Sequence, residues 1–378
     1  MVGEAKVAVF TPFSGDGGVE VMMVRLLQEM VSRNIAVDLL LVKGFGPYID
    51  KIPSEVNVIR MSNHTFLSIW SLYKYLRDKK PRALLVPKHR AGIVALLARR
   101  LLEFINVAAK QDRARVVLSI GTAMSVPLQQ AFWFKRWWWK KTMQWFYPWA
   151  DIVVGVSECV ARDVRRMSGL AESKVIAINN PVVSNELFVK AKESITHPWL
   201  VNHEYPVIIG CGRITRQKDF PNLIQAFAIV RKTQNCRLLI MGRGEDLEDC
   251  QQLALSLGIA DDVSFTGFIE NPFAIMARAD LFVLSSRWEG SPVVLVEALA
   301  LGIPVVSTDC TCGPQETLQG GKIGKLVPVN DSQALALAIQ ETLAAPLASV
   351  ELRAAAEPFS VKNSVDHHLQ VMGLQGQA

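Results

Sequence analysis

The chain alternates short runs of β-branched and aliphatic residues with amphipathic helical segments along most of its length. The first apolar run, 7–10, precedes a predicted helix at 18–33 and a second predicted strand at 36–42. These runs are almost continuously apolar, as in strands that are buried on both faces. The alternation therefore predicts an α/β fold in which helices cover both faces of parallel sheets.

The length of 378 residues and one interruption of this pattern indicate two domains. The alternation weakens between 182 and 206 and then restarts. We therefore expect two Rossmann-like, doubly wound domains that face a central cleft. The predicted parts are an N-terminal domain at 1–185, a linker at 186–205, a C-terminal domain at 206–358, and a helix at about 359–376 that returns to the first domain. Ligands of such sheets bind beyond the carboxyl ends of the strands.

Composition narrows the class of protein. Half of the residues are hydrophobic and a fifth are charged, which is typical of a packed globular protein. No stretch of 18 uncharged apolar residues occurs, and the first apolar run is too short for a signal peptide. We therefore expect a cytoplasmic protein. The six cysteines form no zinc-binding pattern, and no metal site is expected.

Two carboxylates, Glu289 and Glu297, accompany an almost wholly apolar predicted helix. Ser291 is predicted to cap this helix, with Pro292 at its first position. Mostly helical rise would separate the carboxylates by roughly 12 Å, whereas the dyad of a retaining glycosidase needs ~5–5.5 Å. The pair therefore predicts two contacts along one extended ligand. The alternative is a structural Glu297 that bonds a neighbouring loop.

Two cations, Arg213 and Lys218, lie between a predicted strand at 207–211 and a helix that begins near Pro221. A helix N-terminus offers free N–H groups, and cationic side chains add charge-assisted hydrogen bonds. This pattern predicts a diphosphate site, the alternative being a solvated basic loop.

Glycines mark further turns at the carboxyl ends of predicted strands. Gly17 and Gly18 follow the first strand, where backbone could approach a ligand closely. Gly242-x-Gly244 lacks the third glycine of a dinucleotide fingerprint, which disfavours a dehydrogenase.

One segment combines aromatic and basic side chains, because six of the nine tryptophans lie between 133 and 149. Tryptophan favours the membrane interface and basic residues favour anionic lipid. We expect peripheral attachment to the inner face of the cytoplasmic membrane through Trp133, Lys135, Arg136, Trp137, Trp138, Trp139, Lys140 and Lys141. The alternative is tryptophans that pack in the domain core or in a dimer contact. Nucleic acid is not expected, since no other basic surface supports it.

Together these segments resemble the large retaining family of glycosyltransferases with the GT-B fold, glycosyltransferase family 4 (glycosyl transferases group 1). The matching segments are Gly17-Gly18-Val19-Glu20, Val156-Ser157 with Ala161, Asn180-Pro181-Val182, Gly212-Arg213 with Lys218, Gly242-x-Gly244, Phe265-x-Gly267, and Ala279-Asp280 through Glu297. They occur in the order of the family and cover nearly the whole chain. The Glu-x7-Glu and Arg-x4-Lys elements together make the resemblance specific.

The resemblance implies roles for particular residues. Arg213 and Lys218 would bind the diphosphate of a nucleotide sugar and stabilise it as the leaving group. Glu289 would contact sugar hydroxyls, and Glu297 ribose hydroxyls. The further donor-binding candidates are Gly17, Gly18, Gly212, Gly242, Gly290 and Ser291. No Asp-x-Asp pair is present, consistent with the metal-independent, front-face substitution expected of this fold.

The chain departs from the family at one position. Many relatives carry a histidine after the strand that corresponds to 116–119, whereas this chain reads Ser119-Ile120-Gly121-Thr122. His89, with Lys88 and Arg90, is the nearest acceptor-side candidate. The alternative is a structural histidine.

The implied function is transfer of a hexose to a glycan or polyprenyl-linked lipid acceptor, with the acceptor bound by the N-terminal domain and the donor by the C-terminal one. Biosynthesis of a surface polysaccharide or glycolipid is the expected setting. Two alternatives remain: a nucleotide-sugar epimerase of the same fold, and a catalytically degenerate subunit that binds sugar nucleotides.

Overall fold

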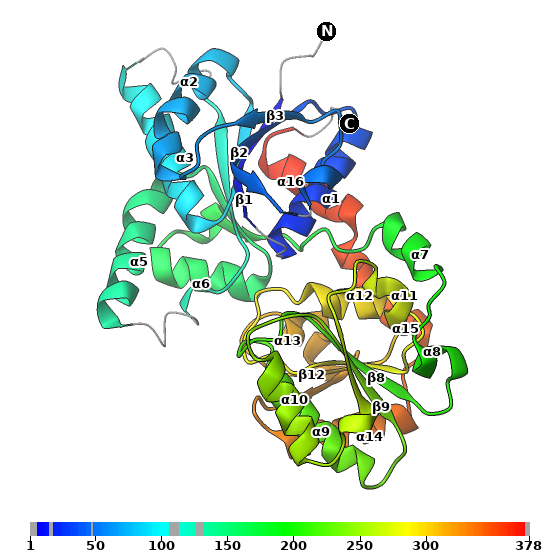
Figure 1. The fold of residues 1–378 in the computed structure, drawn as a ribbon. Helices are drawn as coiled ribbons and strands as arrows, with labels where there is room; N and C mark the ends of the chain where they lie inside the picture. The colour runs from blue at the N-terminus through cyan, green and yellow to red at the C-terminus, as the bar shows by residue number, and fades with distance from the viewer. Residues whose placement is uncertain (1–5, 15–17, 47, 106–112, 126–131, 375–378) are drawn as a thin grey trace. The chain divides into compact units, whose positions relative to one another are not determined.

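The computed structural model describes residues 6–14, 18–46, 48–105, 113–125 and 132–374. The chain divides into two compact units, Met1–Pro181 with Ser360–Ala378, and Val182–Phe359 (Figure 1). Each unit contains a parallel sheet with helices packed against it. The predicted α/β fold with two Rossmann-like domains is therefore confirmed.

The first unit is built on a parallel sheet whose seven described strands run in the order β3-β2-β1-β4-β5-β6-β7. The strands are β1 (Val7–Ser14), β2 (Val37–Phe45), β3 (Asn57–Arg60), β4 (Ala83–Pro87), β5 (Arg115–Ile120), β6 (Ile152–Gly155) and β7 (Val175–Ala177). Every residue of the central strand β4 is buried, whereas the edge strand β3 is largely exposed. This difference explains the continuously apolar runs of the inner strands.

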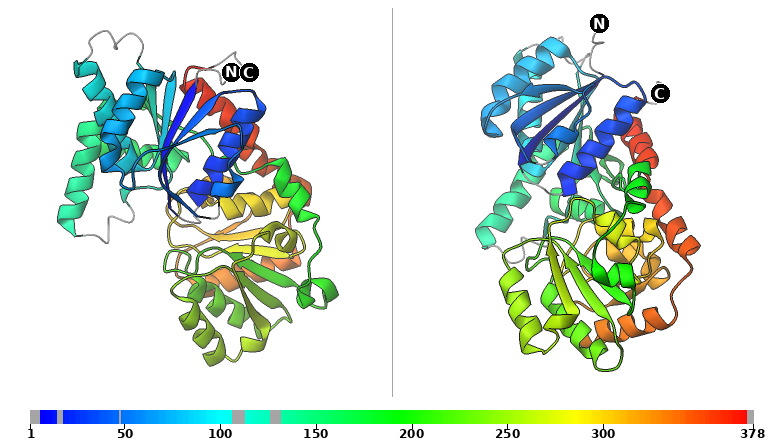
Figure 2. Two further views of the ribbon diagram at one scale, coloured as in Figure 1. Left: turned by 45° about the horizontal axis from the view of Figure 1, so that its top comes forward. Right: turned by 45° about the vertical axis from the view of Figure 1, so that its right-hand side comes forward.

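The helices of the first unit cover both faces of this sheet (Figure 2). They are α1 (Gly18–Ser32), α2 (Ile69–Lys79), α3 (His89–Ile105), α5 (Trp133–Phe146), α6 (Glu158–Ser168) and α16 (Val361–Val371), with the short helices η1 (Ile49–Lys51), η2 (Phe66–Ser68), η4 (Tyr147–Trp149) and η5 (Glu172–Lys174). The last helix, α16, buries Val365 and Leu369 in the same core cluster as Leu27 of α1. Arg33 also pairs with Asp366. The end of the chain therefore completes the first unit.

The second unit has a parallel sheet whose six described strands run in the order β10-β9-β8-β11-β12-β13. The strands are β8 (Val207–Cys211), β9 (Arg237–Met241), β10 (Val263–Gly267), β11 (Leu281–Leu284), β12 (Val305–Thr308) and β13 (Lys325–Val327). The helices are α7 (Asn185–Ala191), α8 (Pro198–Asn202), α9 (Phe220–Arg231), α10 (Leu247–Ser256), α11 (Pro272–Met276), α12 (Val293–Leu301), α13 (Pro314–Thr317), α14 (Ser332–Ala344) and α15 (Ser349–Ala356), with the short helices η6 (Ala260–Asp262), η7 (Gln319–Gly321) and η8 (Glu357–Phe359). Helices α9, α10 and α14 share one core cluster with the sheet, represented by Phe227, Ala254 and Ile339.

One expected part of the chain differs. The stretch 186–205, predicted as a linker, contains most of α7 and all of α8 and belongs to the second unit. Mostly polar residues at 192–197 and the single proline Pro198 interrupt its apolar pattern, and this concealed two short helices, of seven and five residues.

Among the described residues, no single helix has the length and apolar character to cross a membrane. The pair Ser332–Ala344 and Ser349–Phe359, bent by 120°, meets those criteria only when taken together.

Candidate functional site

Glycines let the loops after β8 and β9 pack backbone against backbone. The Gly212 N–H donates to the Met241 carbonyl at 2.9 Å, and the Gly242 N–H to the Gly267 carbonyl at 2.8 Å. A Cβ atom on Gly242 would lie 1.8 Å from the Gly212 carbonyl oxygen, and one on Gly244 would lie 1.9 Å from the Ile214 carbonyl oxygen. Gly242, predicted to bind the donor, is thus required for loop packing whatever it binds.

The loop after β8 carries Lys218, whose Nζ lies 2.6 Å from Oε1 of Glu289 in the loop after β11. Glu289 is only 7% exposed, so its buried carboxylate needs a charged or hydrogen-bonding partner, which Lys218 supplies. Ser286 donates a second hydrogen bond to the same oxygen, at 2.7 Å. The fold thus joins the Arg-x4-Lys and Glu-x7-Glu elements at the carboxyl ends of adjacent strands.

Three further contacts fasten these two loops together. The Arg287 N–H donates to the Gln217 carbonyl at 2.8 Å, and the Gln217 side chain donates to the Trp288 carbonyl at 3.0 Å. The Arg287 guanidinium also pairs with buried Asp219 at 2.9 Å. Arg213, at the start of the same segment, is exposed. The residues on either side of Lys218 are therefore fixed to the loop after β11, while Arg213 faces solvent.

Helix α12 begins one residue later than predicted. Its N-cap is Pro292 and its first residue is Val293, so the predicted capping by Ser291 is wrong. The carbonyl of Pro292 accepts the first hydrogen bonds of the helix, and Ser291 Oγ is buried without a hydrogen bond among the described residues. Gly290 and Ser291 therefore stand between Glu289 and the N-terminus of α12.

Glu297 lies within α12 and is 6% exposed. Cys211 lies at the end of β8. Burial, and to a smaller extent the negative charge of Glu297, raise the pKa of the Cys211 thiol to about 12. Lys218 acts in the opposite direction on the same thiol. Glu297 and Lys218 thus act in opposite directions on one thiol at the end of β8.

Metal ligands are not clustered here. Over the described ranges, no group of three or more His, Cys, Asp or Glu side chains has the arrangement of a metal site.

In the first unit, Lys88 rather than His89 bonds the neighbouring segments at the carboxyl edge of the sheet. Lys88 has a left-handed backbone, with φ of 79°, and its Nζ donates to Glu20 Oε1 at 2.8 Å and to the Pro12 carbonyl at 3.0 Å. Glu20 lies in the first turn of α1, which begins at Gly18. Lys88 thus bridges the end of β1 and the start of α1, while Gly17 lies outside the described residues.

His89 is enclosed by α5 and η4. Its Nδ1 lies 2.8 Å from the Tyr147 hydroxyl and its Nε2 lies 3.3 Å from Thr142 Oγ1. Its ring stacks on Trp139 with 4.6 Å between centroids. Burial, with a smaller contribution from Arg90, lowers the pKa of His89 to about 4. Both ring nitrogens are engaged, so the structural alternative is favoured over an acceptor contact; Arg90 is exposed.

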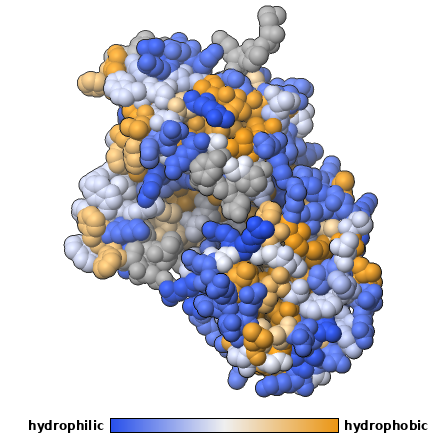
Figure 3. Space-filling model, in the orientation of Figure 1, coloured by the Kyte–Doolittle hydropathy of each residue, from blue (hydrophilic) through white to orange (hydrophobic). Residues whose placement is uncertain are grey.

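Helix α5 presents most of its aromatic residues to solvent. Trp133 is 78% exposed and Trp138 is 48% exposed, whereas Thr142 and Met143 are buried. The exposed large hydrophobic residues of this region are Phe132, Trp133, Phe134, Trp137, Trp138 and Trp145. Orange and pale side chains cover this helix in Figure 3. Packing in the domain core is thus excluded for them.

Trp139 is the exception among the predicted membrane-facing residues. It stacks on His89 and is only partly exposed, because its position on the helix faces α3. The basic residues Lys135, Arg136 and Lys140 are exposed, and Lys141 is partly exposed.

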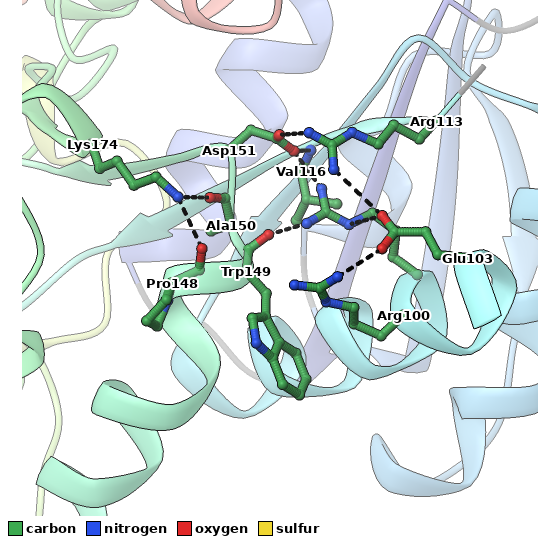
Figure 4. Close-up of polar contacts among 10 residues, drawn as sticks. Arg100, Glu103, Arg113, Val116, Pro148, Trp149, Ala150, Asp151 and Lys174 are labelled. Atoms are coloured by element: carbon green, nitrogen blue, oxygen red, sulfur yellow. Dashed lines mark hydrogen bonds and ion pairs between the residues drawn. The ribbon is translucent and has the colours of Figure 1, made fainter. Parts of the chain in front are cut away.

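The carbonyl groups that follow α5 are clamped by cations (Figure 4). The Arg99 guanidinium binds the Trp149 carbonyl and the Asp151 carboxylate. Lys174 donates to the carbonyls on either side of Trp149, at 2.9 and 3.2 Å. Arg100 lies over the Trp149 ring at 5.2 Å from its centroid. These contacts fix the end of η4, the short helix that follows α5, to α3 and to the start of β6.

The sequence did not single out two side chains that bond candidate site residues, Glu20 and Ser286. Glu20 is the last residue of the Gly-Gly-Val-Glu segment, and Ser286 stands three residues before Glu289. Their partners, Lys88 and Glu289, lie 68 residues away and three residues away respectively. The short spacing could have signalled Ser286, but nothing local signalled Glu20.

Comparisons with known families account for nearly the whole chain. The model of Glycosyltransferase Family 4 matches residues 16–186, and the model of Glycosyl transferases group 1 matches residues 191–358. The two matches correspond closely to the two units.

Similar curated proteins include an uncharacterized glycosyltransferase of Methanocaldococcus jannaschii, 32% identical over 46% of this chain and 44% of that protein. The lipopolysaccharide core biosynthesis glycosyltransferase LpsE of Rhizobium meliloti is 34% identical over 37% of this chain and 40% of LpsE. These two matches span less than half of each relative. The N-acetylgalactosamine-N,N'-diacetylbacillosaminyl-diphospho-undecaprenol 4-alpha-N-acetylgalactosaminyltransferase of Campylobacter jejuni is 25% identical over 87% of this chain and 88% of that protein.

Solved structures share the fold along almost the full length. HepE of Anabaena, crystallised with UDP, has a TM-score of 0.78 at 19% identity and covers 97% of this chain and 99% of HepE. The lipopolysaccharide outer core galactosyltransferase WaaB has a TM-score of 0.72 at 18% identity and covers 97% of this chain and 98% of WaaB. Both likenesses support the GT-B fold. The two family models together match residues 16–186 and 191–358, which is nearly the whole chain. This protein therefore belongs to glycosyltransferase family 4, the glycosyl transferases group 1.

Proposed function

We propose that this protein is a retaining glycosyltransferase that moves a hexose from a nucleotide-diphosphate sugar to a glycan or polyprenyl-linked lipid acceptor. The observation that carries the proposal is the contact between Lys218 and Glu289, 2.6 Å apart at the carboxyl edge of the second sheet. In this proposal the cation binds phosphate and the carboxylate beside it accepts hydrogen bonds from sugar hydroxyls. Glu297 belongs to α12, the helix that follows the Glu289 loop.

The proposed chemistry uses these groups in one displacement. Arg213 and Lys218 bind the diphosphate, which leaves the anomeric carbon with the bonding electron pair and gains negative charge. The acceptor oxygen bonds that carbon on the face from which the phosphate departs, and the phosphate takes the hydroxyl proton. Fixed cations stabilise the charge that develops, which is the largest contribution expected in such a site. Glu289 holds the sugar and Glu297 the ribose.

The named relatives support a narrower substrate class. HepE has been crystallised with UDP-glucose, and the Campylobacter jejuni relative acts on a diphospho-undecaprenol glycan. LpsE and WaaB are enzymes of lipopolysaccharide synthesis. We therefore propose a UDP-hexose donor and a lipid-linked or lipopolysaccharide acceptor, in the synthesis of a surface polysaccharide or glycolipid.

Donor binding is tested by thermal unfolding with a panel of UDP-, GDP- and ADP-sugars. A ligand at 100 times its Kd stabilises the native state by about 2.7 kcal/mol, so one base series should raise Tm by several degrees. Release of the nucleotide and the anomeric configuration of the product then test transfer with retention. Wild-type turnover in both Lys218→Ala and Glu289→Ala would exclude the assigned site.

The same assays separate the two alternatives. An epimerase would change the configuration of the sugar when no acceptor is present. A degenerate subunit would bind the donor but neither hydrolyse nor transfer it. Either result would contradict the proposed transferase function and support the corresponding alternative.

A second part of the proposal concerns the setting of the reaction. We propose that α5 attaches the protein peripherally to the inner face of the cytoplasmic membrane, because it exposes aromatic rings together with Lys135, Arg136 and Lys140. Such a helix lies in the interface, with its rings at the headgroups and its cations on anionic lipid. A lipid-linked acceptor would then be presented to the enzyme at that surface.

A further inference from the structure

Ser286 is a fully buried serine that touches the site without belonging to either sequence element. It follows β11, and its hydroxyl donates to Glu289 Oε1 at 2.7 Å. Lys218 Nζ lies 2.6 Å from the same oxygen. Two donors therefore converge on Oε1, and among the described residues no hydrogen bond reaches Oε2.

The backbone at Ser286 is itself held in place. Thr308, fully buried at the end of β12, donates from Oγ1 to the Ser286 carbonyl at 2.6 Å. The neighbouring Ser285 donates from Oγ to the Lys218 carbonyl at 2.8 Å. Consecutive serines are thus bonded to the two partners of one ion pair: Ser285 to the main chain of Lys218, and Ser286 to the side chain of Glu289.

We propose that Ser286 is a positioning residue that directs Glu289 toward the donor sugar. A carboxylate has about four acceptor positions, so two bonds on Oε1 leave Oε2 able to accept from sugar hydroxyls. This inference rests on the proposed function and adds to it a determinant of sugar recognition that does not contact the nucleotide.

The hydroxyl of Ser286 matters because Lys218 has two tasks. The ammonium group of Lys218 is on a flexible stem, and a bound diphosphate attracts it. Ser286 has a short side chain and a backbone fixed by Thr308, so its hydrogen bond to Glu289 persists when Lys218 turns toward phosphate. Without it, the carboxylate rotates and the sugar loses an oriented acceptor.

The test compares Ser286→Ala with wild type by titration calorimetry. UDP is titrated in parallel with UDP-glucose, UDP-galactose and UDP-N-acetylglucosamine. Ser286→Ala removes a hydrogen bond to a charged carboxylate, so the affinity for the bound UDP-sugar should fall on the order of tenfold. Affinity for UDP should stay within about twofold of wild type, since the nucleotide does not depend on Glu289. Ser286→Cys, which keeps a weak donor, should recover part of the loss.

Two matched variants give the contrast. Ser285→Ala frees the main chain of Lys218 and should weaken UDP and UDP-sugar in parallel. Ser364→Ala removes a buried hydroxyl bonded to the Asn179 carbonyl of the first unit and should change neither affinity.

Equal losses for UDP and UDP-sugar in Ser286→Ala and Ser286→Cys would overturn the inference, as would wild-type affinity for both ligands. If wild-type protein binds none of the four ligands, the proposed UDP-hexose donor fails instead. The wild-type titration therefore tests the function, and the ratio of variant to wild-type losses tests Ser286.

Discussion

At the scale of single residues, the pairing of Lys218 with Glu289 is a poor device for stability. Taking two charges out of water costs much of what their attraction returns, so a buried pair contributes little net stability. Removing one partner is different, because the other charge is left buried and uncompensated. A pair of this kind is better explained by what a ligand requires than by what folding requires.

We therefore expect Lys218→Met to lower the free energy of unfolding by about 3–5 kcal/mol. The double variant Lys218→Met with Glu289→Gln should recover part of that loss while remaining inactive. Urea unfolding measures the first effect and nucleotide release measures the second. Additive losses in the double variant would show that the two side chains do not interact.

His89 supplies a prediction about pH. Its pKa in the folded protein is about 4, below the ordinary value of 6.5, so the unfolded chain binds a proton between these values that the folded chain does not. The contribution of neutral His89 to the free energy of unfolding is therefore fully present above pH 6.5 and is lost as the pH falls toward 4. By pH 5 the loss should reach about 2 kcal/mol. Urea unfolding of His89→Gln at pH 7 and pH 5 should show a smaller decrease than wild type; equal decreases would contradict the assignment.

At the scale of elements, α5 differs from the other long helices because its solvent side is aromatic. A helix normally buries its apolar stripe against the sheet. Here Thr142 and Met143 are buried, while Trp137 and Trp138 face outward. Exposed rings with flanking cations match an anionic interface better than open water.

Flotation with liposomes tests this element. Wild-type protein should bind vesicles that contain phosphatidylglycerol and should not bind vesicles of phosphatidylcholine alone. The double variant Trp137→Ser with Trp138→Ser should lose most of that binding. Trp70→Ser is the matched control, because Trp70 is exposed on α2 of the same unit and should have no effect. Absence of wild-type binding, with dimers in light scattering, would assign the aromatic surface to a protein contact.

At the scale of the whole molecule, two sheets of the same kind carry different ion pairs at their carboxyl edges. The second unit pairs Lys218 with Glu289 at the carboxyl ends of its strands, where doubly wound sheets bind ligands. The first unit, completed by α16, uses the same edge to hold Lys88 and Glu20. A fold shared with HepE at only 19% identity leaves loops and surface helices free to differ.

Local pattern in the sequence predicted many of the strands and long helices. An apolar run with β-branched residues predicted 207–211 as a strand, and the structure has a strand with those bounds. These signals depend only on neighbours in the chain, so one sequence carries them. Motif spacing likewise identified Lys218 and Glu289 as candidates. Local pattern failed for short helices such as α7 and α8, whose seven and five residues are too few to show a helical period.

Tertiary structure alone decided which candidates meet. Lys218 and Glu289 are 71 residues apart, and Lys88 is 68 residues from Glu20, so no local period records either contact. The same holds for His89, whose partners on α5 and η4 lie 53 and 58 residues away. Periodicity determines which residues face a sheet, but burial and hydrogen bonding across elements determine which charges pair. The exposure of α5 follows for the same reason, since only packing shows which side of a helix is covered.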